Sequence, residues 1–371
     1  MTPALGLIVN PIAGMGGSVG LKGTDGAATL AAARARGAVP RAGARAARAM
    51  AALAAALPGA SLIAAPGAMG AAALAGLDLT VDSLAGAPPA ATGAALTRQA
   101  AALLAARGVA AILFAGGDGT ARDVAGVLGL ATPMLGIPCG VKMHSGVFAT
   151  SPEAAGRLAA DLLRSRAGLR CVEIMDVDED AVRAGRLAAR LHGYARAPYA
   201  RSLLQGAKSG TAPDDAALLD AACAEIAREL APGVLYLVGP GATAKRVLSA
   251  LGLEGTLLGV DAVRDGALVG RDLSEAEALA LAGSGPIGVI VGVIGGQGFV
   301  FGRGNQQIGP EALRRSGRDG LVIIAGAAKL AALSEPKLLI DTGDPALDAA
   351  LAGHIRVRTG PRQSMLMRLG P

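Results

Sequence analysis

Short apolar runs alternate with helical patterns along the first half of the chain. The helical patterns are rich in alanine, and the apolar runs have the length of strands. Such alternation predicts an open parallel sheet, in which ligands bind at the carboxyl ends of the strands. We predict strands at 5–9, 61–65, 79–81, 112–115 and 134–137 and helices at 27–57, 97–107, 121–128 and 151–164. These elements form a first α/β domain over residues 1–165.

The second half has more strands and fewer long helices. Apolar runs predict strands at 172–177, 187–195, 234–238, 257–260, 287–294 and 355–357. Ser274 and Glu277 form a capping box that begins a helix. We predict a second domain over residues 166–371, either α/β or β-rich. Its basic C-terminal tail is expected to be solvated or to pack back on the first domain.

The strand at 112–115 runs directly into Gly116-Gly117-Asp118-Gly119-Thr120, and a helical pattern follows. A strand, a glycine-rich turn and a helix N-terminus form a binding site for phosphate, because backbone amides and the helix dipole favour an anion. The glycines let a ligand approach the backbone closely. A carboxylate beside phosphates is repulsive unless it accepts a proton or holds a metal, so Asp118 indicates phosphoryl transfer. The alternative is a tight turn in which Asp118 caps the helix.

Two further segments deliver polar groups to the same edge of the predicted sheet. The first strand leads into a loop that contains Asn10, Gly14, Gly16 and Gly17. The strand at 134–137 leads into Lys142, His144 and Ser145. Lys142 is suited to contact a phosphate, and His144 to contact a phosphate or a hydroxyl. A surface lysine and a core histidine are the plain alternatives.

Three segments of the second half are candidates for substrate binding. Gly241 and Thr243 lie between a strand and a helix whose first turn contains Lys245 and Arg246. Asp261 follows the predicted strand at 257–260 and is expected to face a ribose or a metal. The glycine-rich segment 295–308 contains Arg303 and Asn305, which have the hydrogen-bonding groups to bind a phosphate or a base edge.

Composition limits the class of protein. The 371 residues carry a net charge of +6, which weakly favours anionic ligands. The sequence has no run of lysine or arginine, and this argues against nucleic acid as a partner. The apolar runs are too short to cross a bilayer, and no secretory leader is recognised. Three scattered cysteines suit a reducing compartment. We therefore expect a cytoplasmic protein with no membrane partner.

The glycine-rich motifs together resemble a known family. Gly116-Gly117-Asp118-Gly119-Thr120 resembles the signature of the NAD kinase and diacylglycerol kinase superfamily. The segment Val141-Lys142-Met143-His144-Ser145 and the segment 295–308 resemble the ATP-NAD kinase-like branch that includes the acetoin-catabolism protein X, as does 339–345. The resemblance covers about residues 5–360, with the motifs in family order.

The resemblance implies a Rossmann-like nucleotide domain followed by a second domain, as in NAD kinases. ATP with Mg²⁺ would be the phosphoryl donor and the 2′-hydroxyl of NAD the acceptor. Asp118 would accept the proton or position the metal, for which no ligands are assigned. Phosphates would bind at Asn10, Gly14, Gly16, Gly17, Gly116, Gly117, Gly119 and Thr120, and Lys142 would offset developing charge.

Two other functions remain open at this point. An enzyme of the same fold could phosphorylate a lipid or an acetoin-related metabolite, and a nucleotide sensor could retain the loops without catalysis. Asp118 argues against the sensor, since a sensor needs no base. We expect a small-molecule acceptor and a homo-oligomer.

Overall fold

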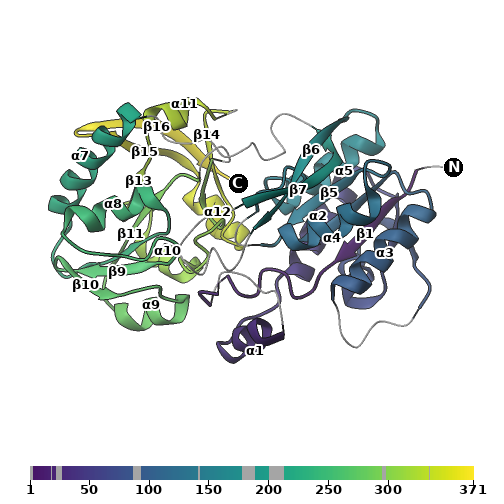
Figure 1. The fold of residues 1–371 in the computed structure, drawn as a ribbon, viewed down its shortest axis with the longest axis horizontal. Helices are drawn as coiled ribbons and strands as arrows, with labels where there is room; N and C mark the ends of the chain where they lie inside the picture. Colours follow the sequence, from purple (N-terminus) through teal and green to yellow (C-terminus); the bar gives the residue numbers. More distant parts are fainter. Residues whose placement is uncertain are drawn as a thin grey trace. The chain divides into compact units, whose positions relative to one another are not determined.

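A computed structural model of the chain describes residues 3–17, 19–21, 27–86, 93–140, 143–177, 189–199, 213–294, 298–333 and 335–371. The chain divides into two compact units (Figure 1). The first comprises Met1–Met15 and Gly23–Gln205, and the second comprises Gly16–Lys22 and Gly206–Pro371. In this division the first unit ends at Gln205, whereas the boundary expected from the sequence lies at residue 165.

A parallel sheet organises the first unit. Among the described residues it has five strands in the order β3-β2-β1-β4-β5, and each neighbouring pair is parallel. The strands are β1 (Leu5–Val9), β2 (Ala60–Ala64), β3 (Leu79–Ser83), β4 (Ala111–Gly116) and β5 (Met134–Pro138). The strand order reverses between β1 and β4, which is the position where doubly wound sheets bind their ligands. The Rossmann-like prediction is confirmed.

Helices cover both faces of this sheet. Because side chains alternate along a strand, Leu7 of β1 packs in one core with residues of α2 and α5, whereas Ile8 packs in the other with residues of α3 and α4. Alanine and glycine allow close approach, and a Cβ on Gly156 of α5 would lie 2.1 Å from Ala49 O of α2. The helices are α1 (Ala27–Ala35), α2 (Ala42–Ala56), α3 (Ala94–Ala106), α4 (Asp118–Leu128) and α5 (Pro152–Leu163), with short 3₁₀ turns at Gly67–Met69 and Ala71–Leu74.

A hairpin accounts for the later boundary of the first unit. Strands β6 (Gly168–Val177) and β7 (Ala189–Tyr199) pair antiparallel. Their inward residues Val172, Ile174 and Ala195 join the same hydrophobic core as α3 and α4. The strands predicted at 172–177 and 187–195 therefore correspond to β6 and β7, but they pack on the first unit.

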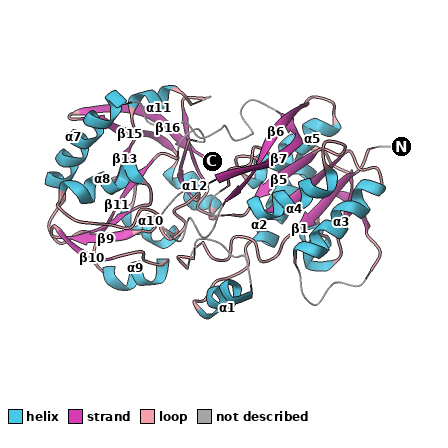
Figure 2. Cartoon of the chain, in the orientation of Figure 1, coloured by secondary structure: helices cyan, strands magenta, loops and turns pink. Residues whose placement is uncertain are grey.

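A mixed sheet organises the second unit (Figure 2). Its described strands number nine, in the order β10-β9-β8-β11-β13-β15-β16-β14-β12. The strands are β8 (Leu235–Val238), β9 (Asp261–Arg264), β10 (Ala267–Gly270), β11 (Ile287–Gly292), β12 (Phe299–Phe301), β13 (Leu321–Ile324), β14 (Lys337–Ile340), β15 (Gly353–Gly360) and β16 (Gln363–Gly370). The helices are α7 (Pro213–Glu229), α8 (Ala242–Ala250), α9 (Glu275–Ala282), α10 (Pro310–Ser316), α11 (Ala327–Ala331) and α12 (Pro345–Leu351).

Strand direction divides this sheet into two halves. Strands β8, β11, β13 and β15 run parallel to one another. Strand β16 is antiparallel to β15, and β14 and β12 follow the direction of β16. The segment that follows β8 and the segment that follows β12 therefore leave the sheet at opposite ends of its strands. The sheet also curls, because Ile294 N, just after β11, donates to Phe299 O of β12 (2.8 Å).

Three expectations about local structure were wrong. The helical pattern at 27–57 forms two helices, since Pro40 lies in the break between α1 and α2. Residues 257–260 precede a strand rather than form one, and β9 begins at Asp261. The C-terminal tail forms β15 and β16 in the sheet of the second unit. Arg358 there is paired with Glu225 (2.6 Å) and Glu229 (2.9 Å), whereas Arg356, Arg362 and Arg368 are exposed as expected.

None of the helices among the described residues has both the length and the apolar character needed to cross a membrane.

Candidate functional site

Three strands of the first unit end side by side in the predicted glycine-rich loops. Asn10 follows β1, and its backbone N–H donates to Ala115 O of β4 (2.9 Å). Cys139 follows β5 and donates to Gly116 O at the end of β4 (3.0 Å). The loops after β1, β4 and β5 are therefore held together at the carboxyl edge of the sheet, where a ligand is expected.

These loops approach so closely that glycine is required at two positions. Gly14 has φ +75°, and a Cβ there would lie 1.8 Å from Cys139 O. A Cβ on Gly116 would lie 2.4 Å from Cβ of Thr120. Gly117 differs, since its Cβ would meet only Gly140 Cα at an ordinary 3.5 Å. Gly14 and Gly116 thus serve the protein's own packing, whereas Gly117 could be kept small for a ligand.

The N-terminus of α4 lies at this edge. Gly117 is its N-cap and makes no side-chain cap. The first amides of a helix have no acceptor within the helix, and the helix dipole favours an anion there. Thr120, in the first turn, accepts a hydrogen bond through its Oγ1 from Asn10 Nδ2 (3.0 Å). The structure thus brings Asn10, Gly14, Gly117, Gly119 and Thr120 together.

Asp118 is buried and points toward the loop after β5. The residue is only 7% exposed. Its Oδ2 accepts from His144 N (2.7 Å), and its Oδ1 accepts from Ser145 N (3.0 Å) and Ser145 Oγ (2.6 Å). Asp118 is therefore more than the helix cap of the plain alternative, because both carboxylate oxygens bind another segment.

The predicted polar residues of that loop have different outcomes. Ser145 contacts Asp118 directly, and His144 does so through its backbone amide. Contact of the His144 side chain with substrate stays a prediction. Lys142 lies outside the described residues, so its expected contact with phosphate also stays a prediction.

The first glycine loop is divided between the two units. Asn10 and Gly14 belong to the first unit, whereas Gly16 and Gly17 belong to the second. Leu21 N donates to Gly16 O (2.8 Å), and a Cβ on Gly20 would lie 3.8 Å from Asp272 O of the second unit. Phosphate binding by Gly16 and Gly17 therefore stays a prediction.

Arg45 is a residue at this edge that the sequence did not identify. Its Nε donates to Pro138 O at the end of β5. Its spacing gives the reason, since Arg45 lies three residues after Ala42 and four before Ala49, both buried on the same face of α2. That spacing could have predicted a half-buried cation beside the loops.

In the second unit, Gly241 and Thr243 lie at the start of α8. Gly241 has φ +102° and donates its amide N–H to Leu257 O (2.8 Å). Thr243 packs against Gly292 at the end of β11, where a Cβ would lie 3.3 Å from Cβ of Thr243. The strand–glycine–helix arrangement predicted here is present, and ligand binding by these two residues stays a prediction.

Asp261 does not face a ribose or a metal. It is fully buried, and its carboxylate accepts from Lys245 Nζ (2.7 Å), Thr256 N (2.7 Å), Thr256 Oγ1 (2.8 Å) and Asp272 N (3.0 Å). Burial lowers the pKa of Lys245, although its pairing with Asp261 opposes that change. The substrate role expected for Asp261 was wrong, because at the start of β9 its carboxylate points into the protein.

Arg303 and Asn305 are buried in the turn after β12. Asn305 Oδ1 accepts from Gly302 N (3.1 Å), and its Nδ2 donates to Val300 O (2.7 Å). The guanidinium of Arg303 lies over the ring of Phe299, with 4.5 Å between the guanidinium carbon and the ring centroid. The amide of Asn305 thus holds its own turn, and substrate contact by either residue stays a prediction.

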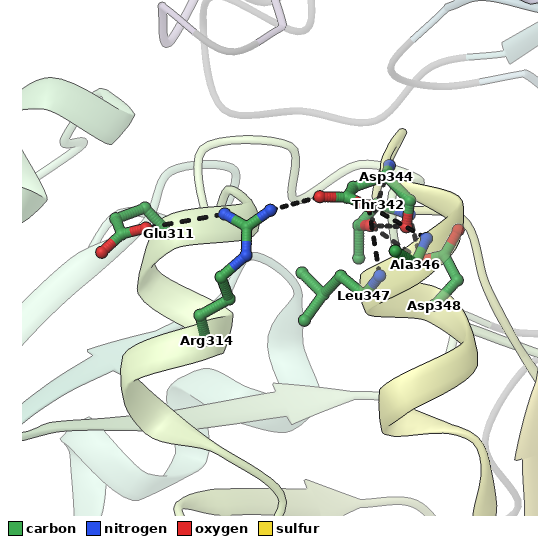
Figure 3. A network of polar contacts seen from close by, with 7 residues as sticks. All are labelled: Glu311, Arg314, Thr342, Asp344, Ala346, Leu347 and Asp348. Carbon is green, nitrogen blue, oxygen red and sulfur yellow. Dashed lines mark hydrogen bonds and ion pairs between the residues drawn. The ribbon is translucent and has the colours of Figure 1, made fainter.

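The segment after β14 is also held by its polar side chains (Figure 3). Asp344 caps α12 by accepting from Ala346 N (3.0 Å) and Leu347 N (3.1 Å). The bond from Leu347 N is the main cause of the lowered pKa of Asp344. Asp348 accepts from both N (3.0 Å) and Oγ1 (2.7 Å) of Thr342, so these residues stabilise the turn.

Within the described residues, no group of three or more His, Cys, Asp or Glu side chains is placed to hold a metal ion. The acidic residues Asp178, Glu179 and Asp180 lie outside the described residues.

Comparison with known proteins identifies both halves of the chain. Residues 5–167 match the model of the ATP-NAD kinase N-terminal domain, and residues 232–369 match that of the ATP-NAD kinase C-terminal domain. No curated protein and no solved structure matches the chain. The two matches cover most of the sequence in the expected order, and they do not distinguish the acetoin-catabolism branch.

Proposed function

The chain belongs to the ATP-NAD kinase family, and we propose that it transfers the γ-phosphoryl group of ATP to the 2′-hydroxyl of NAD. The donor is ATP bound as its magnesium complex, so the metal enters with the substrate. The observation that supports this proposal best is the joining of three loops around Asp118 at the carboxyl edge of the first sheet.

The phosphates bind at the N-terminus of α4. Gly117 leaves room beside the first-turn amides, which with the helix dipole attract the anion. Asn10 and Thr120 are joined side chain to side chain, so the loop after β1 is fixed beside that turn. Phosphoryl transfer depends chiefly on such positioning and on electrostatic stabilisation. Lys142 would offset the charge that develops on the transferred group.

Asp118 acts as the general base. The bond between the γ-phosphorus of ATP and its bridging oxygen breaks, and the acceptor hydroxyl oxygen forms a new bond to that phosphorus. The hydroxyl proton passes to the Asp118 carboxylate, and ADP leaves with the bridging oxygen. The hydrogen bonds from His144 N and Ser145 N keep the carboxylate oriented.

The first test is formation of NADP by the purified chain from ATP, Mg²⁺ and NAD, detected with an NADP-specific enzyme. In Asp118→Asn the base and the charge are lost, so we expect kcat to fall by at least ~10²-fold. The asparagine NH₂ must face His144 N or Ser145 N, because both oxygens of Asp118 accept hydrogen bonds. Melting temperature and ATP affinity by calorimetry are therefore measured beside kcat.

The matched control is Asp123→Asn. Asp123 lies on the same helix, where it pairs with the half-exposed Arg98 (2.7 Å) at the surface, and its loss should leave kcat unchanged. Near-normal turnover of Asp118→Asn would remove Asp118 from the mechanism. Consumption of ATP only with another hydroxyl acceptor, such as a lipid, would replace NAD as the substrate.

A further inference from the structure

Ser145 joins the loop after β5 to two other elements of the first unit. Its Oγ lies 2.6 Å from Asp118 Oδ1 at the start of α4 and 2.9 Å from Met175 N of β6. Its own backbone N–H also donates to Asp118 Oδ1 (3.0 Å). One small side chain thus connects the candidate base with a strand that lies more than fifty positions away along the sequence.

The contacts of the hydroxyl fix the direction of its proton. Met175 N–H is a donor, so Ser145 Oγ accepts there and has its single proton left to donate. Two acceptors lie within reach, Asp118 Oδ1 at 2.6 Å and Met175 O at 3.3 Å. The short contact to a carboxylate is the charge-assisted and stronger one. Ser145 therefore donates to Asp118 while β6 holds its oxygen in place.

Burial makes this bridge hard to replace. Ser145 is 1% exposed. After loss of the hydroxyl, water could not easily enter to satisfy Met175 N and Asp118 Oδ1. The carboxylate would keep its bonds from the backbone N–H groups of residues 144 and 145, and these belong to the loop that Ser145 connects to β6.

We infer that Ser145 is a positioning residue, which orients the Asp118 carboxylate for proton transfer by linking it to β6. The inference rests on the proposed function, since it assigns Ser145 a role in turnover through Asp118. It differs from the expectation that Ser145 binds substrate, because the hydroxyl is engaged within the protein on both sides.

The experiment is a double-mutant cycle of Ser145→Ala and Asp118→Asn, with kcat, both KM values and the melting temperature measured for all four proteins. A charge-assisted hydrogen bond corresponds to a roughly 10- to 100-fold effect, so Ser145→Ala should lower kcat by that factor. KM for ATP and NAD should change little. In the Asp118→Asn background, Ser145→Ala should cause almost no further fall in kcat, because its target is already absent.

Ser151→Ala is the matched control. Ser151 is a buried serine of the same unit that caps α5 by accepting from Ala154 N (3.1 Å). Its loss should lower the melting temperature, as loss of an N-cap does, without changing kcat. A fall in kcat that merely follows stability would appear in this control as well.

The outcomes separate this inference from the proposed function. An equal fall in kcat in both backgrounds, or an unchanged kcat in Ser145→Ala, would overturn the positioning role while NADP formation by the parent chain still supports the function. If the parent chain forms no NADP, the proposed function fails. The melting temperatures then test whether Ser145 and Asp118 are coupled. Additive falls in melting temperature across the four proteins would refute the coupling, and non-additive falls would support it.

Discussion

The buried ion pair of the second unit provides a direct test of how the structure assigns Asp261. Lys245→Met removes the ammonium group and keeps a flexible side chain of similar length. Lys245 Nζ donates to Asp261 Oδ2 (2.7 Å) and to Val238 O (2.9 Å), so it joins α8 to β8 and β9. The change leaves the Asp261 carboxylate charged within the protein.

The expected loss of stability depends on the hydrogen-bond donors that Asp261 keeps. Removing one partner of a buried pair costs about 3–5 kcal/mol. Asp261 keeps three other hydrogen bonds, two from Thr256 and one from Asp272 N. These bonds stabilise part of its charge, so we expect Lys245→Met to fall at the lower end, about 3 kcal/mol. Asp261→Asn places an NH₂ group among those donors and should cost about 3–5 kcal/mol. The double variant should cost less than the sum, since neither charge is left behind.

The assay must report on the second unit, because a chain of two units need not unfold in one step. Hydrogen exchange of peptides from β8 and β9, measured by mass spectrometry under denaturant, gives their free energy of opening. Arg246→Met is the matched control on the same helix. Arg246 pairs with Asp220, whose side chain is 63% exposed, so its loss should cost no more than about 1 kcal/mol.

Two results would refute this reasoning. Equal costs for Lys245→Met and Arg246→Met would show that the buried pair has no special weight in the fold. A folded Asp261→Asn protein with a raised KM for NAD alone would return Asp261 to the ribose contact that its position in the sequence had indicated.

Two further predictions concern a glycine and a cysteine. Gly117→Ala should fold normally, because its Cβ would meet Gly140 Cα at an ordinary 3.5 Å, and it should lose ATP affinity in calorimetry. Gly116→Ala should instead lower the melting temperature, because its Cβ would lie 2.4 Å from that of Thr120. Unchanged ATP affinity in Gly117→Ala would contradict a phosphate site at this turn. Burial raises the pKa of Cys223 from 9.0 to about 12, so a thiol reagent at mildly alkaline pH should modify the exposed Cys171 and spare Cys223. The unfolded thiol ionises first as pH rises, so this group's contribution to stability is present below pH 9.0 and declines toward about 12; labelling of Cys223 in the folded chain would show that it is not in the core.

Elements that are determined by neighbouring residues were the ones predicted best from the sequence. The apolar run of β4, the glycines after it and the helical pattern of α4 are close in the chain, and their order was predicted correctly, although α4 begins at Asp118 rather than at residue 121. The cap at Ser274 was recognised because capping depends on a few neighbouring residues. The partners of Asp118 could not be predicted, since they come from a loop 26 and 27 positions away.

Strand β16 was missed although its pattern is visible. Met365, Met367 and Leu369 alternate with more exposed residues, which is the period of a strand with one buried face. The arginines of the tail led to its interpretation as a solvated end. Arg358 pairs with Glu225, a residue of α7, and this contact across the sequence could not be read from the tail itself.

The two halves of the family resemblance have different physical meanings. In the second unit, Asn305 holds the turn after β12, and Asp348 and Asp344 hold the turn and helix after β14. Gly302 lies against Asp341 O, where a Cβ would be 1.8 Å away. These motif residues maintain backbone geometry, and the strand directions place them at the edge opposite to Gly241 and Thr243. In the first unit, the motif instead brings the first turn of α4 and a buried carboxylate to the carboxyl edge of a parallel sheet. A motif can therefore identify a family because it maintains the fold, and the chemistry is to be sought first at Asp118.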